Sequence, residues 1–258
     1  MILDIFSLDG KTAIVTGANG GIGKSIARRF ANYECNIVLC DLSLTDLEGF
    51  ADELREKGAK VLVIQCDVTN RNEIKNVVNM TLEKFTSIDI LVNNAGITSK
   101  RTAAEEFPLE VWQKIMDVNL TGVFLFTQEV GKVMLGQGSG SIINISSGAS
   151  QQAVRGSLGY SVSKSGVNML TKGFASEWAE RGVRVNGVAP YYVETPILAS
   201  IKETDKEFMD KVLSRSPMRR MGKPEEIAAG VVFLASDASS YMTGETISID
   251  GGAQAMGI

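Results

Sequence analysis

The chain has 258 residues, of which 44% are hydrophobic and 22% charged, with a formal net charge of −4. This composition is typical of a folded globular protein, and no long basic run indicates a nucleic-acid partner. The sequence contains no histidine, which excludes Ser-His-Asp and Cys-His nucleophile chemistry and the usual histidine-containing zinc sites. We therefore expect no metal centre, and any acid–base work must fall to Tyr, Lys, Asp or Glu side chains.

No linker, low-complexity tract or internal repeat divides the chain, so residues 1–258 are interpreted as a single domain. The first ten residues, MILDIFSLDG, lack a basic stretch followed by an apolar run, and no segment approaches the roughly 20 apolar residues that span a bilayer. We expect a cytoplasmic protein that acts on a small molecule and has no membrane partner.

Short β-branched runs alternate along the chain with segments of helical periodicity, which indicates βαβ units and a parallel sheet. With right-handed crossovers, the predicted fold class is α/β, a doubly wound domain with a seven-stranded parallel sheet. A polar segment at about 191–216, with Pro196 inside it and Pro217 directly after it, breaks the alternation and is interpreted as a substrate lid. The predicted strands are 12–16, 36–40, 61–65, 90–93, 141–146, 184–188 and 246–250, and the predicted helices are 22–33, 44–57, 72–85, 109–135, 160–180 and 224–235.

The run TGANGGIG at 16–23 follows the first predicted strand and opens the first predicted helix. Gly17, Gly21 and Gly23 allow a tight turn and close approach of the backbone to a pyrophosphate at the helix N-terminus. The spacing is G-x-x-x-G-x-G, which differs from the common G-x-G-x-x-G fingerprint. A glycine-rich turn can be purely structural, and it is the position between strand and helix that indicates a dinucleotide site.

Asp41 ends the second predicted strand, 18 residues after Gly23. An acid there can accept hydrogen bonds from a ribose 2′-hydroxyl and repels a 2′-phosphate, which favours NAD over NADP. The alternative is an aspartate that caps a helix beginning near Leu42. Asp67 and residues 93–96 follow the next two strands, where they could meet the adenosine or cap loops.

Tyr160 and Lys164 are four residues apart in a predicted helix, and Ser147 lies thirteen residues before Tyr160. Side chains at i and i+4 share one helix face, so the Lys164 ammonium can lie beside the phenol and lower its pKa from the usual value of about 10. The pair is then predicted to act as a general acid–base group, with Ser147 polarising the reacting oxygen. Tyr-x-x-x-Lys alone is weak evidence; its occurrence with Ser147 and the glycine run makes it specific.

Taken together, these motifs resemble the short-chain dehydrogenase/reductase family, in its compact branch of about 250 residues, over essentially the whole chain. The resemblance implies a Rossmann-like sheet, frequent homotetramers, and hydride transfer between nicotinamide and a secondary alcohol or ketone. The matching motifs are TGANGGIG at 16–23, Asp67-Val68, NNAG at 93–96, DVNLTGVF around Asn119, INISS at 143–147, YSVSK at 160–164, VNGVAP at 185–190, PMRRMGKPEEIA, and SIDGG near the end.

The resemblance implies a role for each catalytic candidate. Tyr160 is the acid–base, Lys164 holds the nicotinamide ribose and lowers the tyrosine pKa, and Ser147 bonds to the reacting oxygen. Asn119 supports a water relay for protons. The residues expected to bind the cofactor are Gly17, Asn19, Gly21, Ile22, Gly23, Asp41, Leu42, Asp67, Val68, Asn94, Ala95, Gly96, Tyr160, Lys164, Pro190, Val193 and Thr195.

One departure from the family pattern is Tyr191, because the family usually has glycine after the proline that ends the sixth strand. We expect Tyr191 and Tyr192 to line the substrate site together with Ser147 and Tyr160. Arg155 is the candidate clamp for a substrate carboxylate, with Lys100 and Arg101 as further cations expected near the reacting centre. The alternative for these cations is a solvated surface position.

The N-terminal segment and the NNAGITSKR stretch are similar to the gluconate 5-dehydrogenase and 2-deoxygluconate 3-dehydrogenase subgroup. The expected substrate is therefore a sugar acid or polyol, oxidised with NAD. Two alternatives stay open: a 3-oxoacyl-thioester reductase of the same family, which normally prefers NADPH, and a non-catalytic nucleotide sensor. Retention of Ser147, Tyr160 and Lys164 disfavours the sensor.

Overall fold

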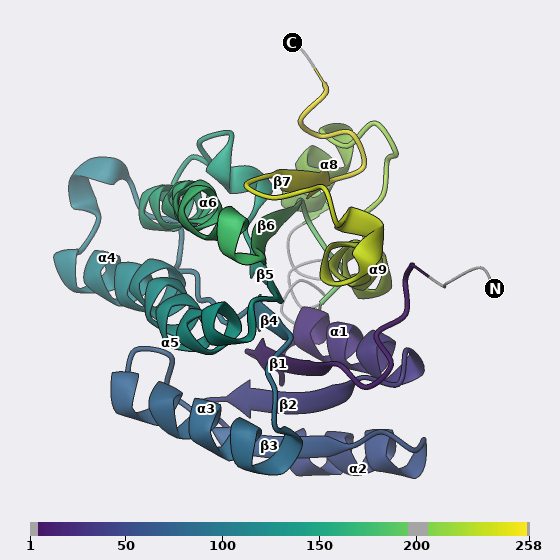
Figure 1. Cartoon of the computed structure of the whole chain (residues 1–258). Helices are drawn as coiled ribbons and strands as arrows, with labels where there is room; N and C mark the ends of the chain where they lie inside the picture. The colour runs from purple at the N-terminus through teal and green to yellow at the C-terminus, as the bar shows by residue number, and fades with distance from the viewer. Residues whose placement is uncertain (1–4, 196–205, 257–258) are drawn as a thin grey trace.

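A computed structural model describes residues 5–195 and 206–256 of the chain. Seven parallel strands form one sheet in the order β3-β2-β1-β4-β5-β6-β7 (Figure 1). The predicted doubly wound sheet is confirmed. The strands are β1 (Thr12–Thr16), β2 (Asn36–Asp41), β3 (Val61–Gln65), β4 (Ile90–Asn93), β5 (Gly140–Ile145), β6 (Val183–Pro190) and β7 (Thr246–Ile249).

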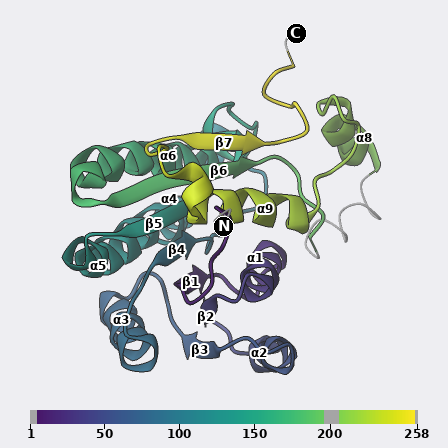
Figure 2. The ribbon, with the colours of Figure 1, turned by 45° about the vertical axis from the view of Figure 1, so that its right-hand side comes forward.

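Helices cover both faces of this sheet (Figure 2). One face carries α1 (Gly21–Asn32), α2 (Leu47–Glu56) and α9 (Pro224–Ala235). The other carries α3 (Arg71–Phe85), α5 (Gly122–Gln137) and α6 (Leu158–Trp178), and α4 (Leu109–Met116) packs against α6. No helix among the described residues is long and apolar enough to cross a bilayer.

Alternation along each strand distributes apolar side chains to both layers. In β1, Ala13 and Val15 join the buried cluster that includes Phe30 of α1, whereas Ile14 joins the cluster that includes Phe126 of α5. Successive strand residues point to opposite faces, so a strand covered on both faces must be apolar throughout. All five residues of β1 are buried, as this requirement demands.

The predicted helix 109–135 is helical throughout and runs on to Gln137, but it contains a π-helical turn that the sequence did not indicate. A π-helical turn, η2 (Asp117–Thr121), separates α4 from α5 and contains the buried Asn119. The π-turn inserts an extra residue per turn, a distortion that occurs often at functional sites and leaves no mark in the hydrophobic period. In the sheet, β1, β3 and β4 match the predicted bounds, and the other strands differ by one or two residues at an end, the largest shift being β6, which runs on to Pro190.

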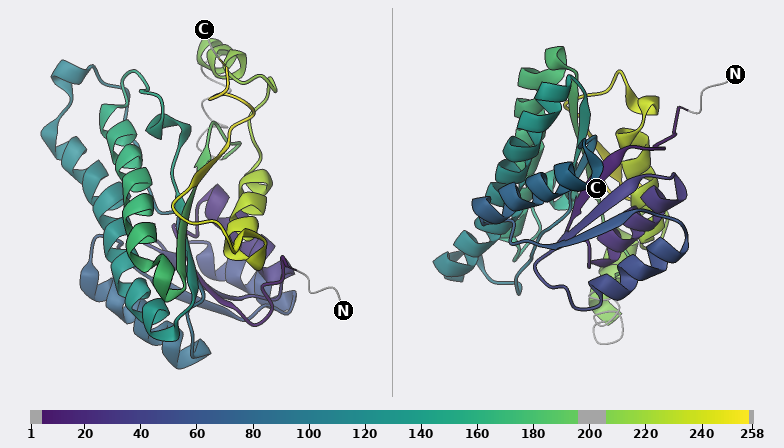
Figure 3. Two further views of the ribbon diagram at one scale, coloured as in Figure 1. Left: turned by 45° about the horizontal axis from the view of Figure 1, so that its top comes forward. Right: turned by 60° about the horizontal axis from the view of Figure 1, so that its bottom comes forward.

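The predicted lid at 191–216 contains a helix that the sequence did not indicate, α8 (Lys206–Ser214), which buries Met209 and Val212. Residues 196–205 of that predicted lid lie outside the described residues. α8 and the C-terminal segment lie at the same end of the molecule (Figure 3).

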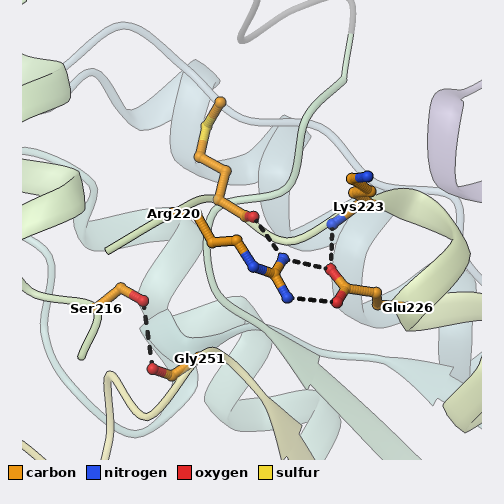
Figure 4. Close-up of polar contacts among 6 residues, drawn as sticks. Ser216, Arg220, Lys223, Glu226 and Gly251 are labelled. Atoms are coloured by element: carbon orange, nitrogen blue, oxygen red, sulfur yellow. Dashed lines mark hydrogen bonds and ion pairs between the residues drawn. The ribbon is translucent and has the colours of Figure 1, made fainter. Parts of the chain in front are cut away.

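The chain that follows α8 is anchored twice (Figure 4). Ser216 Oγ donates to the Gly251 carbonyl at 3.3 Å. The Arg220 guanidinium pairs with both Glu226 carboxylate oxygens at 2.8 and 2.6 Å. The Lys223 N–H also donates to that carboxylate, at 2.7 Å, which ties the segment to the first turn of α9. A planar two-point pair of this kind fixes orientation as well as distance.

Candidate active site

The candidate residues gather at the carboxyl ends of the parallel strands. The order of the sheet reverses between β1 and β4, and the crevice outside that point is where open α/β sheets bind ligands. β1 leads into the glycine run, β5 leads to Ser147, and β6 leads to Pro190. Sequence segments more than 100 residues apart therefore meet at one edge.

Two glycines of the run have no room for a side chain. Gly17 has φ +61°, and a Cβ on it would lie 2.8 Å from Ala95 Cα. A Cβ on Gly23 would collide with the Gly17 carbonyl and lie 2.9 Å from Ala18 Cα. The Asn94 amide donates to the carbonyls of Thr16 and Gly17 at 3.0 and 2.9 Å, which fastens the loop after β4 to the glycine turn. The positive φ of Gly17 is a backbone conformation that residues with a side chain rarely adopt.

The start of α1 fits a dinucleotide pyrophosphate. Its N-cap, Gly20, makes no side-chain capping bond, and no acidic residue lies in the first turn, which Gly21 and Ile22 begin. The first N–H groups of a helix lack intrahelical partners and carry partial positive charge. Backbone N–H groups without a side-chain cap and without a nearby carboxylate suit a phosphate.

Asp41 stands at the end of β2, beside the glycine turn. Its carboxylate accepts from the Asn19 N–H at 3.0 Å and from the Ser43 N–H at 3.1 Å. Leu42 is exposed next to it. Of the helix α1 cations, Lys24 and Arg28 lie over the Phe50 ring, at 5.6 and 4.8 Å from its centroid. The Asp41 carboxylate thus orders the glycine turn, whereas Lys24 and Arg28 lie against the Phe50 ring.

The loops after β3 and β4 lie at the same edge of the sheet as the glycine turn. The Asp67 carboxylate accepts from the N–H and the hydroxyl of Thr69, both at 2.8 Å, so it caps its own turn. Val68 packs against Gly122 at the start of α5. Gly96 keeps space open, because a Cβ there would lie 3.4 Å from Asn119 Oδ1 and 3.5 Å from Lys164 Nζ.

Ser147, Tyr160 and Lys164 are brought together, as predicted, but the pKa of the phenol moves the other way. Burial raises the pKa of Tyr160, a hydrogen bond from the Ser147 hydroxyl offsets part of the rise, and Tyr192 adds to it. The expectation that Lys164 lowers this pKa is wrong here. The ammonium lies 5.9 Å from the Tyr160 ring centroid and donates to the Ile145 carbonyl at 2.7 Å instead. Burial in turn lowers the pKa of Lys164 to about 8.

Asn119 clamps the backbone of the loop after β4. Its Oδ1 accepts from the Ile97 N–H at 2.8 Å, and its Nδ2 donates to the Ile97 carbonyl at 2.9 Å and to Ser163 Oγ at 3.2 Å. Ser163 belongs to the helix that carries Tyr160 and Lys164. The π-turn therefore places one amide between the loop that follows β4 and helix α6. Sequence reasoning missed Ile97 and Ser163, because neither residue type signals a partner.

The segment after β6 turns across the mouth of the site. Val193 is buried and forms a bridge with Gly222, and Thr195 is half-buried at the edge of the described residues. Tyr191 and Tyr192 are both half-buried, with their rings edge-on at 4.7 Å. Tyr191 does not have a positive φ, so its backbone does not require the glycine that the family pattern places there.

The three candidate cations have different surroundings. Arg155 is exposed, and so is Lys100. Arg101 places its guanidinium 4.6 Å from the centroid of the Phe208 ring of α8, which in turn meets Tyr192 edge-on at 5.6 Å. The row of aromatic rings formed by Tyr191, Tyr192 and Phe208 therefore ends at the Arg101 guanidinium. Phe208 could not be found from the sequence, since the lid was not expected to hold a helix.

Comparisons with known proteins agree with this geometry. A family model described as enoyl-(acyl carrier protein) reductase matches residues 17–254. A 3-oxoacyl-[acyl-carrier-protein] reductase of Thermotoga maritima is 42% identical over 245 residues, covering 95% of this chain and 98% of that protein. A 2-dehydro-3-deoxy-D-gluconate 5-dehydrogenase of Bacillus subtilis is 41% identical over 250 residues, 96% of each chain.

The fold also matches solved structures. A gluconate 5-dehydrogenase from Burkholderia cenocepacia J2315, crystallised in complex with NADP and tartrate, superposes with a TM-score of 0.94 at 36% identity, over 100% of each chain. The similarity spans the whole molecule, including the loops that follow the carboxyl ends of the strands.

Proposed function

The chain belongs to the short-chain dehydrogenase/reductase family, a family of oxidoreductases that act on CH–OH groups, and on that premise we propose that it transfers a hydride between NAD and the secondary alcohol or ketone of a sugar acid or related polyol. The observation that carries the proposal is the placement of Ser147, Tyr160 and Lys164 together, beside a glycine turn that fits a dinucleotide. We place the reaction in the cytoplasm. An absorbance assay of reduced nicotinamide, with NAD or NADP and a panel of sugar acids, neutral polyols and 3-oxoacyl thioesters, tests the proposal.

In the proposed mechanism the glycine turn and Asp41 would hold a nicotinamide dinucleotide, which would provide hydride-transfer chemistry when bound. Tyr160 moves the proton: the neutral phenol donates it to the oxygen of a ketone, and the phenolate takes it back from an alcohol. The Ser147 hydroxyl holds the reacting oxygen and the phenol together. Lys164 supplies a positive charge beside Asn119, and Asn119 keeps the loop at Ile97 and the catalytic helix in register.

The pKa values predict a pH dependence for ketone reduction. Lys164 keeps its proton below its lowered pKa of about 8 and loses it above. The raised pKa of Tyr160 keeps the phenol neutral across this range. We therefore expect kcat/KM for reduction to be flat below pH 7 and to fall as the pH rises through about 8. In Lys164→Arg the fall should move upwards, since an arginine stays charged; a wild-type profile that is flat to pH 9.5 would contradict this role for Lys164.

We propose NAD as the preferred cofactor because of Asp41, although the Burkholderia cenocepacia structure holds NADP. Asp41→Asn removes the carboxylate charge and keeps the side-chain shape. The NADP-to-NAD ratio of kcat/KM should rise about tenfold, as expected when one repulsion with a 2′-phosphate is lost. Asp46→Asn, at an exposed position near the start of α2, is the matched control and should leave the ratio unchanged. An equal ratio in both variants would remove Asp41 from cofactor selection.

For the substrate carboxylate we propose Arg101 together with Arg155 as candidate clamps. Arg101 is the stronger candidate, because it closes the wall formed by Tyr192 and Phe208. Arg101→Met should lower kcat/KM for a gluconate-type acid by about 10- to 100-fold, and far less for a neutral polyol. Arg155→Met should shift the same preference less, because both side chains are exposed and it is Arg101 that lies against the Phe208 ring. If neither variant changes the acid-to-polyol preference, the clamp must be discarded.

A second candidate function is reduction of a 3-oxoacyl thioester, favoured by the 42% identity to the Thermotoga maritima reductase. It differs from the first in direction and cofactor, since NADPH would be oxidised. Asp41 disfavours it. The substrate panel distinguishes the two within one experiment.

We also propose that the enzyme is a homotetramer. The supporting feature is an apolar groove of about 620 Å³ between α5 and α6, lined in part by Phe124, Met169 and Phe174. Met169 is 67% exposed, an unusual state for a large apolar side chain beside others. Trp178, in contrast, is buried against Gly131 within the chain and does not line this groove.

A further inference from the structure

The C-terminal segment reaches back to the turn that carries Ser147. Gln254 Nε2 donates to the Gly148 carbonyl at 3.0 Å. Gly148 begins a short 3-10 turn, η3 (Gly148–Ser150), directly after Ser147. The contact is close-packed, because a Cβ on Gly148 would lie 3.1 Å from Gln254 Nε2 and 3.4 Å from Tyr191 Cδ2.

The η3 turn fixes the direction of the Ser147 hydroxyl. The Ala149 N–H donates to Ser147 Oγ at 3.1 Å. With its oxygen held in this way, the Ser147 side chain is kept beside Tyr160, whose pKa it lowers. A displacement of Gly148 and Ala149 would therefore move the hydroxyl away from the phenol.

Gln254 is itself held in place by its own segment. Its backbone N–H and that of Gly252 both donate to the Asp250 carboxylate at 2.8 Å. Gly251 and Gly252 have φ values of +64° and +88°, which fold the chain back after β7. The Gly251 carbonyl also accepts from Ser216 Oγ at 3.3 Å (Figure 4), so this turn is fixed to the segment that follows α8. The amide of Gln254 is thus presented from a braced turn and is not a freely rotating surface group.

We propose that Gln254 is a positioning residue for the reaction, which holds the Gly148 carbonyl and through η3 keeps the Ser147 hydroxyl on the Tyr160 phenol. This inference rests on the proposed roles of Ser147 and Tyr160. The contact on which it rests is one hydrogen bond, which the Gln254 side-chain amide donates to the carbonyl of Gly148, 106 residues earlier in the chain. It makes the end of the chain part of the active site.

The test removes the donor and keeps the shape, with Gln254→Glu in the full-length protein. Gln254→Ala serves as a second variant that introduces no charge. Gln151→Glu is the matched control, because Gln151 follows the same turn but its side chain donates to Ser248 Oγ at 3.4 Å. For both Gln254 variants we expect kcat to fall about 10- to 100-fold, the size of effect that a misplaced catalytic group produces. The dissociation constant for NAD should be unchanged.

A merely structural role would not give the next two results. For alcohol oxidation, which needs the Tyr160 phenolate, the rise of the rate with pH should move to higher pH in Gln254→Ala, since Ser147 is what lowers the pKa of Tyr160. In a Ser147→Ala background, Gln254→Ala should cause no additional loss, because the hydroxyl that it positions is gone.

The inference is overturned alone if Ser147→Ala is inactive while both Gln254 variants turn over like Gln151→Glu. It is also overturned if Gln254→Ala lowers kcat equally with and without the Ser147 hydroxyl. If Ser147→Ala itself keeps full activity, the assignment of Ser147 under the proposed function fails, and the positioning role fails with it.

Discussion

Tyr160→Phe should lower kcat by about 1,000-fold or more while leaving the dissociation constant for NAD within about twofold. The variant removes one oxygen atom, and that oxygen is the proposed carrier of the proton. General acid–base groups contribute about 100- to 10,000-fold to a rate. The ring itself stays, so the packing around Lys164 and Tyr192 is kept, and the loss reports on proton transfer alone. Steady-state rates with the substrate found in the panel, together with a fluorescence titration of NAD, measure both quantities.

Tyr33→Phe is the control for this substitution. Tyr33 is half-buried and follows α1 at the end of that helix away from the glycine turn, so loss of its hydroxyl should leave kcat unchanged. If Tyr160→Phe keeps more than about a tenth of the wild-type rate, proton transfer does not depend on this phenol, and the mechanism must be abandoned.

Gly23→Ala should weaken NAD binding by about 100-fold. The added methyl collides with the Gly17 carbonyl and lies 2.9 Å from Ala18 Cα, and both contacts are with backbone that cannot rotate away. Overpacking of this kind costs about 1–3 kcal/mol, and at this position the shift is imposed on the turn that should hold the pyrophosphate. Titration of the protein with NAD gives the change directly.

Gly49→Ala is the matched control, since Gly49 also lies in a helix, α2, but a Cβ there meets nothing within 4 Å. It should leave NAD binding unchanged and raise the free energy of unfolding by about 0.5–1 kcal/mol, because alanine is the better helix former. Equal NAD affinity in Gly23→Ala and wild type would show that the turn does not contact the dinucleotide.

Much of the fold could be predicted because single residue patterns decide it. The five consecutive apolar or β-branched residues of β1 admit only a strand buried on both faces, and Pro224 followed by two glutamates defines the start of α9. What failed depends on contacts distant in sequence. The π-turn at Asn119 is held by the Ile97 backbone, and α8 buries Met209 and Val212 against partners that no local pattern reveals.

The sequence predicted which side chains lie together at the candidate site, but not their pKa values or the partners of their charged groups. The i, i+4 spacing of Tyr160 and Lys164 correctly put the side chains on one helix face. It could not show that the ammonium bonds to the Ile145 carbonyl or that burial dominates both pKa values. Likewise, the list of cations near the site contained Arg101, but only the ring of Phe208 distinguishes it from the exposed Arg155.

The central claim, direct hydride transfer from a carbinol carbon to nicotinamide, is tested most directly by isotope transfer. The protein is incubated with NAD and a sugar acid that carries deuterium on the carbinol carbon, and the nicotinamide product is analysed by absorbance and mass spectrometry. We expect one reduced nicotinamide for each ketone formed, with the deuterium on the nicotinamide ring. Ketone formed without label on the nicotinamide, or no reduced nicotinamide from any alcohol with either dinucleotide, would contradict the account.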